Sequence, residues 1–118
     1  MSIQQTALYE EIKHVYARVD ESIQDRLGQC YALAGRFVMD HPEYMLVHGI
    51  INGRRFGIDK DNPHAWVEKD NVAYDLVQDQ ELPKETYYEV FGAVPDKTYT
   101  HNEAIKMMLK HEHFGPWR

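Results

Sequence analysis

The chain has 118 residues, of which 43% are hydrophobic and 27% charged, as expected of one globular domain spanning residues 1–118. Its net charge of −6 argues against binding to the phosphate backbone of nucleic acids, because that contact needs clustered positive charge. The same charge argues against docking on an anionic membrane surface.

Cys30 is the only cysteine, so neither an intramolecular disulfide nor a thiolate-rich metal site can form. The N-terminal residues include acids and glutamines without a continuous apolar run, and they do not resemble a signal peptide. No segment approaches the roughly 18 apolar residues of a membrane span. We therefore expect a cytoplasmic protein.

Two helices are predicted in the first part of the chain. Apolar residues recur at three- and four-residue steps from 3 to 27, which indicates an amphipathic helix from its cap Ser2 to about Arg26. Gly28 interrupts this pattern. A second, buried helix is expected from residue 29 or 30 to Val38, and Pro42 stops it because the residue before a proline leaves the helical region.

The middle of the chain has the shorter period of strands and predicts two hairpins. The first hairpin should pair Tyr44–Ile51 with Arg54–Ile58 through a tight turn at residues 52–53. After a polar loop over 59–63, the second should pair Ala65–Lys69 with Val72–Val77 through a turn at residues 70–71.

Only short elements are expected between residues 78 and 100. A last helix is predicted over His101–His111, where Thr100 and Glu103 can form a capping box. The aromatic tail that follows should be docked or frayed. The predicted class is α+β: N-terminal helices packed on an antiparallel β-sheet, then a C-terminal helix.

Three residues in these elements suggest a nucleophilic site. A cysteine acts as a thiolate, and the first turn of a helix, where Cys30 is expected, stabilises negative charge. His64 is expected where a strand begins and could accept the thiol proton. Asp75, on the neighbouring strand, could orient the imidazole ring.

The predicted hairpin supports the pairing of histidine and aspartate. With a two-residue turn at 69–70 or 70–71, His64 lies opposite or diagonal to Asp75, on the same face of the sheet. That face would also carry Trp66 and Val77 and would point at the helix of Cys30. Asp79 is the nearest substitute for Asp75.

From Gly28 to Leu76 the sequence resembles the transglutaminase-like superfamily. The stretch 28–34, GQCYALA, is similar to the nucleophile motif of that superfamily, and 64–68, HAWVE, is similar to its histidine strand. Asp75 stands where its aspartate is expected. The resemblance implies a circularly permuted papain-like core and cysteine acyl-transfer chemistry on a peptide or protein amide, without a cofactor.

The sequence departs from the superfamily at three points. The interval from His64 to Asp75 is short, and the chain is close to the bare core, so calcium is not implied. No tryptophan precedes Cys30 that could stabilise an oxyanion. The Cys30 backbone N–H and Gln24, placed as the glutamine of papain-like proteases, are the candidate oxyanion donors.

Several alternatives stay open. Trp66 is expected to pack beside the site, with substrate contact a secondary role. His101, His111 and His113 do not predict a metal site, because His101 and His111 are ten residues apart and the predicted helix ends near His111. The leading hypothesis is an enzyme that hydrolyses or transamidates an amide through a thioester. The alternative is a catalytically inactive transglutaminase-like domain that binds a protein partner.

Overall fold

The computed structural model describes residues 29–52 and 61–117. Within them a five-stranded antiparallel sheet combines with three helices, which confirms the α+β class. The predicted helix of residues 2–26 and the candidate Gln24 lie outside the described residues. The elements are α3 (Cys30–Asp40), β1 (Met45–Asn52), β2 (Asp61–Lys69), β3 (Val72–Asp75), β4 (Gln80–Pro83), α4 (Lys84–Phe91), β5 (Val94–Tyr99) and α5 (His101–His111).

Helix α3 confirms the predicted buried helix and its start. Its buried residues recur at three- and four-residue steps, which gives the helix one apolar face, and that face packs chiefly on β2. The helix ends at Asp40, two residues before Pro42. These buried residues are Cys30, Leu33, Ala34, Gly35, Phe37 and Val38.

The strands of the sheet are ordered β4-β3-β2-β1-β5. The second predicted hairpin is confirmed: Lys69 pairs with Val72 across a two-residue turn in which Asp70 has a φ of 55°. Its limits differ from the prediction. β3 ends at Asp75 rather than Val77, and β2 begins at Asp61 rather than Ala65, because its polar first residues pair with the end of β1.

The first predicted hairpin is wrong in its pairing. β1 is flanked on one edge by β2, with Asn52 opposite Asp61, and on the other edge by β5. The returning strand is therefore β2, and the segment Arg54–Ile58 lies outside the described residues. The pairing of β1 with β5 joins residues about fifty positions apart, and no local turn signal in the sequence could predict it.

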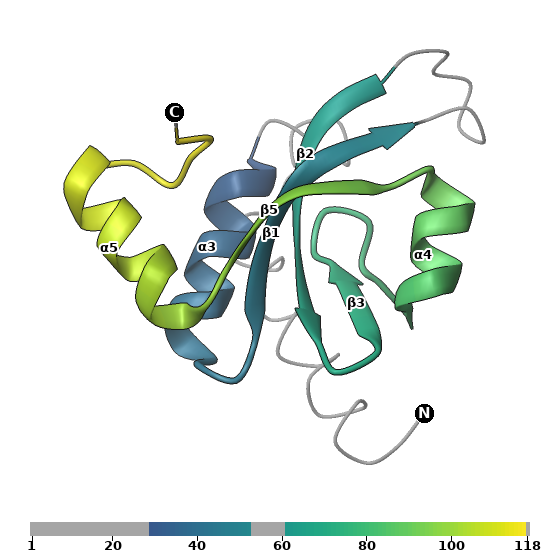
Figure 1. Ribbon diagram of the computed structural model, residues 1–118, viewed down its shortest axis with the longest axis horizontal. Helices are drawn as coiled ribbons and strands as arrows, with labels where there is room; N and C mark the ends of the chain where they lie inside the picture. Colours follow the sequence, from purple (N-terminus) through teal and green to yellow (C-terminus); the bar gives the residue numbers. More distant parts are fainter. Residues whose placement is uncertain (1–28, 53–60, 118) are drawn as a thin grey trace.

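The sheet separates two apolar layers. Figure 1 shows α3 and α5 on one side of the sheet and α4 on the other. Ala65, Val67 and Tyr74 belong to the core under α3, whereas Trp66 and Ala73 belong to the core under α4. We expected the face carrying Trp66 to point at the helix of Cys30, and this expectation is wrong. Strand alternation determines which side chains share a face but not which helix covers it.

The C-terminal helix has the predicted bounds and cap. The Thr100 hydroxyl accepts a hydrogen bond from the Glu103 backbone N–H, and the Glu103 carboxylate accepts one from the Thr100 backbone N–H. The tail after α5 is docked rather than frayed, because the Trp117 ring is 3% exposed and its Nε1 donates to the His113 carbonyl oxygen. None of the helices described for residues 29–52 and 61–117 is long and apolar enough to span a membrane.

Candidate active site

Cys30 is the first residue of α3, where the backbone N–H groups of a helix point out of its end. The preceding residue, Gln29, makes no side-chain capping hydrogen bond, and the first turn contains no acidic residue. No acidic side chain in this turn therefore opposes the positive end of the helix dipole, beside which the Cys30 sulfur lies. The Cys30 side chain is almost entirely buried, with 3% of its surface exposed.

His64 and Asp75 form a direct contact, as the predicted register requires. Val67 lies opposite Tyr74, which places His64 and Asp75 diagonally on the same face of the β2–β3 ladder. The His64 Nε2 atom lies 2.7 Å from the Asp75 Oδ2 atom. Both side chains are buried, so water does not screen this contact.

The contact changes the ionisation of both groups. Burial lowers the pKa of His64, but the charge and hydrogen bond of Asp75, together with a hydrogen bond to Cys30, raise it from 6.5 to about 10. Burial raises the pKa of Asp75, but the charge and hydrogen bond of His64 outweigh burial and hold this pKa below its ordinary value. The contact therefore favours the charged form of each group, and Nε2 is the ring nitrogen that donates to Asp75.

His64 also interacts electrostatically with Cys30, which helps to raise the His64 pKa. Nε2 is occupied by Asp75, so Nδ1 is the ring nitrogen left to face the thiol. β2 pairs with β3 only from Val67 to Lys69, so His64 lies beyond the paired part of β3. The ring can thus reach from the α4 side of the sheet toward the first turn of α3. The structure brings the three predicted residues together in the order thiol, imidazole, carboxylate.

Two further residues hold Asp75, and sequence analysis missed both. The Tyr87 hydroxyl donates to Asp75 Oδ2 at 2.6 Å, from α4. Gln78 donates twice, from its backbone N–H to Oδ1 at 3.1 Å and from its Nε2 to Oδ2 at 3.0 Å. The only sequence signal was the tyrosine pair at 87–88, which could be recognised only once α4 is known to cover this face.

Trp66 is placed in the core rather than at a surface. Its ring is completely buried and stacks beside the His64 ring at a centroid distance of 6.2 Å. Its Nε1 donates to Glu68 Oε2 at 2.9 Å. The same oxygen accepts from the Tyr88 hydroxyl, and Lys84 Nζ lies 3.5 Å from Oε1. Trp66 thus packs beside the site as predicted, and its complete burial argues against the secondary role of substrate contact.

The remaining candidates do not join the site. Asp79, the substitute for Asp75, is in the turn after β3 with a φ of 54°, and the carboxylate that contacts His64 is that of Asp75. Among the residues that the structure describes, no group of three His, Cys, Asp or Glu side chains is placed to hold a metal ion. No family model, curated protein or solved structure matches this chain.

Proposed function

We propose that the protein is a cysteine-dependent acyl-transfer enzyme with Cys30, His64 and Asp75 as its catalytic residues. The observation that carries the proposal is the buried His64–Asp75 contact of 2.7 Å, whose imidazole also interacts with the Cys30 side chain. A core that needed only packing would have no reason to bury two opposite charges beside a thiol, because their desolvation is costly.

The reaction begins with the Cys30 sulfur and the carbonyl carbon of an amide. The sulfur attacks this carbon, its proton having passed to His64 Nδ1, and a tetrahedral oxyanion forms. Collapse of the oxyanion breaks the carbon–nitrogen bond, and His64 returns the proton to the leaving amine. The resulting thioester is resolved by water, which gives hydrolysis, or by an amine, which gives transamidation. Asp75 holds the ring and stabilises its cationic form.

The elements around the site support this chemistry. The backbone N–H groups in the first turn of α3 are natural oxyanion donors, since the Gln29 side chain does not cap this helix end. A cysteine helix packed on an antiparallel sheet that supplies histidine and aspartate, in this chain order, is also the arrangement of a transglutaminase-like, permuted papain-like core. We favour hydrolysis of a peptide or side-chain amide, in a reducing compartment such as the cytoplasm.

The test compares the rate at which iodoacetamide alkylates the folded protein at pH 7 in the parent, in His64→Ala and in His111→Ala. Cys30 is the only thiol, so mass spectrometry reports this site alone. Loss of the imidazole should slow alkylation at least about tenfold, because the thiolate loses its counter-charge. His111, at the end of α5, is the matched control and should leave the rate unchanged.

Turnover is tested with a peptide-amide library in the presence of hydroxylamine, which intercepts a thioester as a hydroxamate. Hydroxamates should form with the parent and not with Cys30→Ala. Equal alkylation rates in the parent and His64→Ala, or hydroxamates from Cys30→Ala, would contradict the proposal.

A second candidate is a non-catalytic domain that binds a protein partner. The observation in its favour is the 3% exposure of Cys30, which leaves little sulfur surface for a substrate to reach. In that case the parent would resist iodoacetamide, and His64→Ala would bind the same partner as the parent.

A further inference from the structure

We propose that Tyr87 is a positioning residue of this site: its hydroxyl holds the Asp75 carboxylate and limits how much of its negative charge reaches His64. The inference rests on the proposed roles of His64 and Asp75 and adds a third group that acts through the carboxylate. The Tyr87 hydroxyl bonds Asp75, which takes no part in bond making or breaking, and Tyr87 is therefore not a catalytic residue.

The geometry at Asp75 carries the proposal. Oδ2 accepts three hydrogen bonds, from His64 Nε2 at 2.7 Å, Tyr87 Oη at 2.6 Å and Gln78 Nε2 at 3.0 Å. Asp75 has no exposed surface, so these donors share the charge of the oxygen without competition from bulk water. The hydrogen bond from Tyr87 therefore weakens the electrostatic interaction between Oδ2 and the His64 ring.

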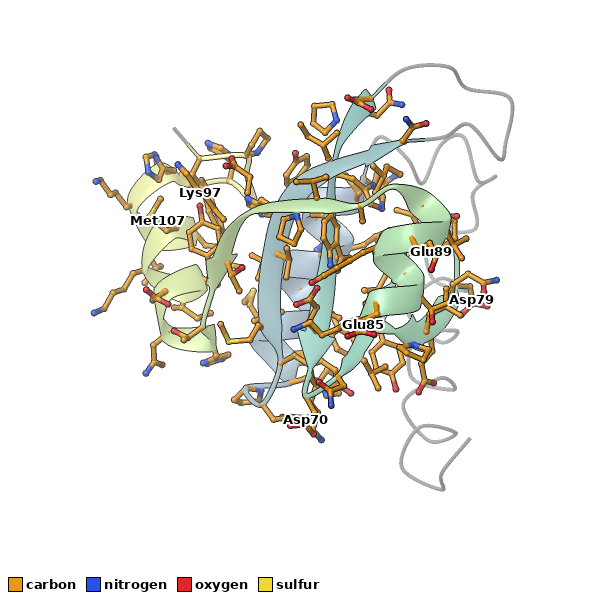
Figure 2. The ribbon with its side chains drawn as sticks, turned by 45° about the vertical axis from the view of Figure 1, so that its right-hand side comes forward. Asp70, Asp79, Glu85, Glu89, Lys97 and Met107 are labelled. Atoms are coloured by element: carbon orange, nitrogen blue, oxygen red, sulfur yellow. The ribbon has the colours of Figure 1, made fainter. Side chains whose placement is uncertain are left out.

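Helix α4 presents Tyr87 in a fixed position. The ring is completely buried and packs against Trp66 and Phe91, at centroid distances of 5.3 and 5.0 Å. Exposed Glu85 and Glu89 lie on the same helix and are labelled in Figure 2, where α4 covers its face of the sheet. The next residue, Tyr88, bonds a different carboxylate, that of Glu68. Two adjacent hydroxyls on one helix thus attach it to two carboxylates.

Gln78 holds the orientation of the Asp75 carboxylate independently of Tyr87. Its backbone N–H binds Oδ1 and its side chain binds Oδ2, so the carboxylate stays oriented when the Tyr87 hydroxyl is removed. The remaining effect of that removal is on charge, since Oδ2 then interacts more strongly with His64. Burial and the neighbouring Asp75 charge hold the pKa of Tyr87 well above 10, so its hydroxyl remains a donor over the range in which His64 titrates.

The titratable groups of this unit come from four elements, α3, β2, β3 and α4. Cys30 faces His64 from α3, Asp75 faces it from β3, and Tyr87 also interacts with Cys30 and with Glu68 on β2. Tyr87→Phe leaves all of these charges in place and removes one hydroxyl, which makes the substitution selective.

The experiment follows the titration of the His64 imidazole by ¹H–¹⁵N NMR in the parent, Tyr87→Phe and Tyr88→Phe. In Tyr87→Phe the midpoint should rise by about one unit, because one hydrogen bond to the carboxylate is lost. In the matched control Tyr88→Phe it should not move. A midpoint that stays in place or falls in Tyr87→Phe, or that rises equally in Tyr88→Phe, would overturn the assignment.

A measurement on the unaltered protein covers the case in which Tyr87→Phe does not fold. Two protons that are hydrogen-bonded to the same carboxylate oxygen lie close together. The buried Tyr87 hydroxyl proton should therefore exchange slowly with water and show a nuclear Overhauser effect to the His64 Nε2 proton. Absence of this signal would count against the shared oxygen. Neither readout uses the Cys30 thiol, so thiol activation and the role of Tyr87 can fail independently.

Discussion

Replacing Asp75 with asparagine should change the pH dependence of folding stability as well as its size. The folded-state pKa of His64, about 10, lies above its ordinary 6.5, so the proton on His64 stabilises the folded state fully below pH 6.5. This stabilisation is lost as the pH rises toward 10. One pKa unit corresponds to 1.36 kcal/mol, so the rise from 6.5 to about 10 sets an upper limit of about 5 kcal/mol on the stabilisation. We expect about half of this limit, because water can enter around His64 once the ion pair with Asp75 is lost.

The assay is urea unfolding of the parent and Asp75→Asn at pH 6, 8 and 10. The difference in unfolding free energy should be largest at pH 6 and should shrink by about 2 kcal/mol or more toward pH 10. Below about pH 4 it should shrink again, because the lowered pKa of Asp75 means that its own stabilisation disappears as the pH falls through the folded-state value. A constant difference from pH 6 to pH 10 would refute the assignment of a charged His64–Asp75 pair.

Two further substitutions test local features of the fold. Thr100→Ala should destabilise the protein by about 1 kcal/mol, because the first turn of α5 loses its capping box. The conservative control Glu103→Gln keeps an acceptor for the Thr100 N–H and should destabilise the protein less. Equal thermal denaturation midpoints for Thr100→Ala and the parent would contradict this prediction. Gly115→Ala should lower the free energy of unfolding by about 1–3 kcal/mol, because the backbone has a φ of 116° and the added methyl would lie 2.7 Å from the His48 ring. A difference from the parent within about 0.5 kcal/mol, the spread of neutral surface changes, would contradict this prediction.

Local signals in the sequence predicted the parts of the site that lie close together in the chain. The apolar spacing of α3 and the glycine before it placed Cys30 at a helix start, and the two-residue turn at 70–71 put His64 and Asp75 on one face. The contact between them followed from strand alternation alone. The same rules predicted α5, because a capping box is a local motif.

Long-range pairing and layer order could not be predicted in this way. Which helix covers which face depends on the path of the chain between elements, so the expectation that Trp66 would face α3 was wrong. For the same reason the sequence did not predict the pairing of β1 with β5 or the approach of Tyr87 to Asp75. The sequence shows which side chains of a strand share a face, but it does not show which helix covers that face.

The two outer strands of the sheet each contain a proline, Pro83 in β4 and Pro95 in β5. A proline has no backbone N–H, so neither margin presents an unbroken row of donors to a strand from another molecule. On β5 the next two residues, Asp96 and Lys97, are charged and exposed. Both features work against the addition of a strand from another molecule at the β5 edge of the described sheet.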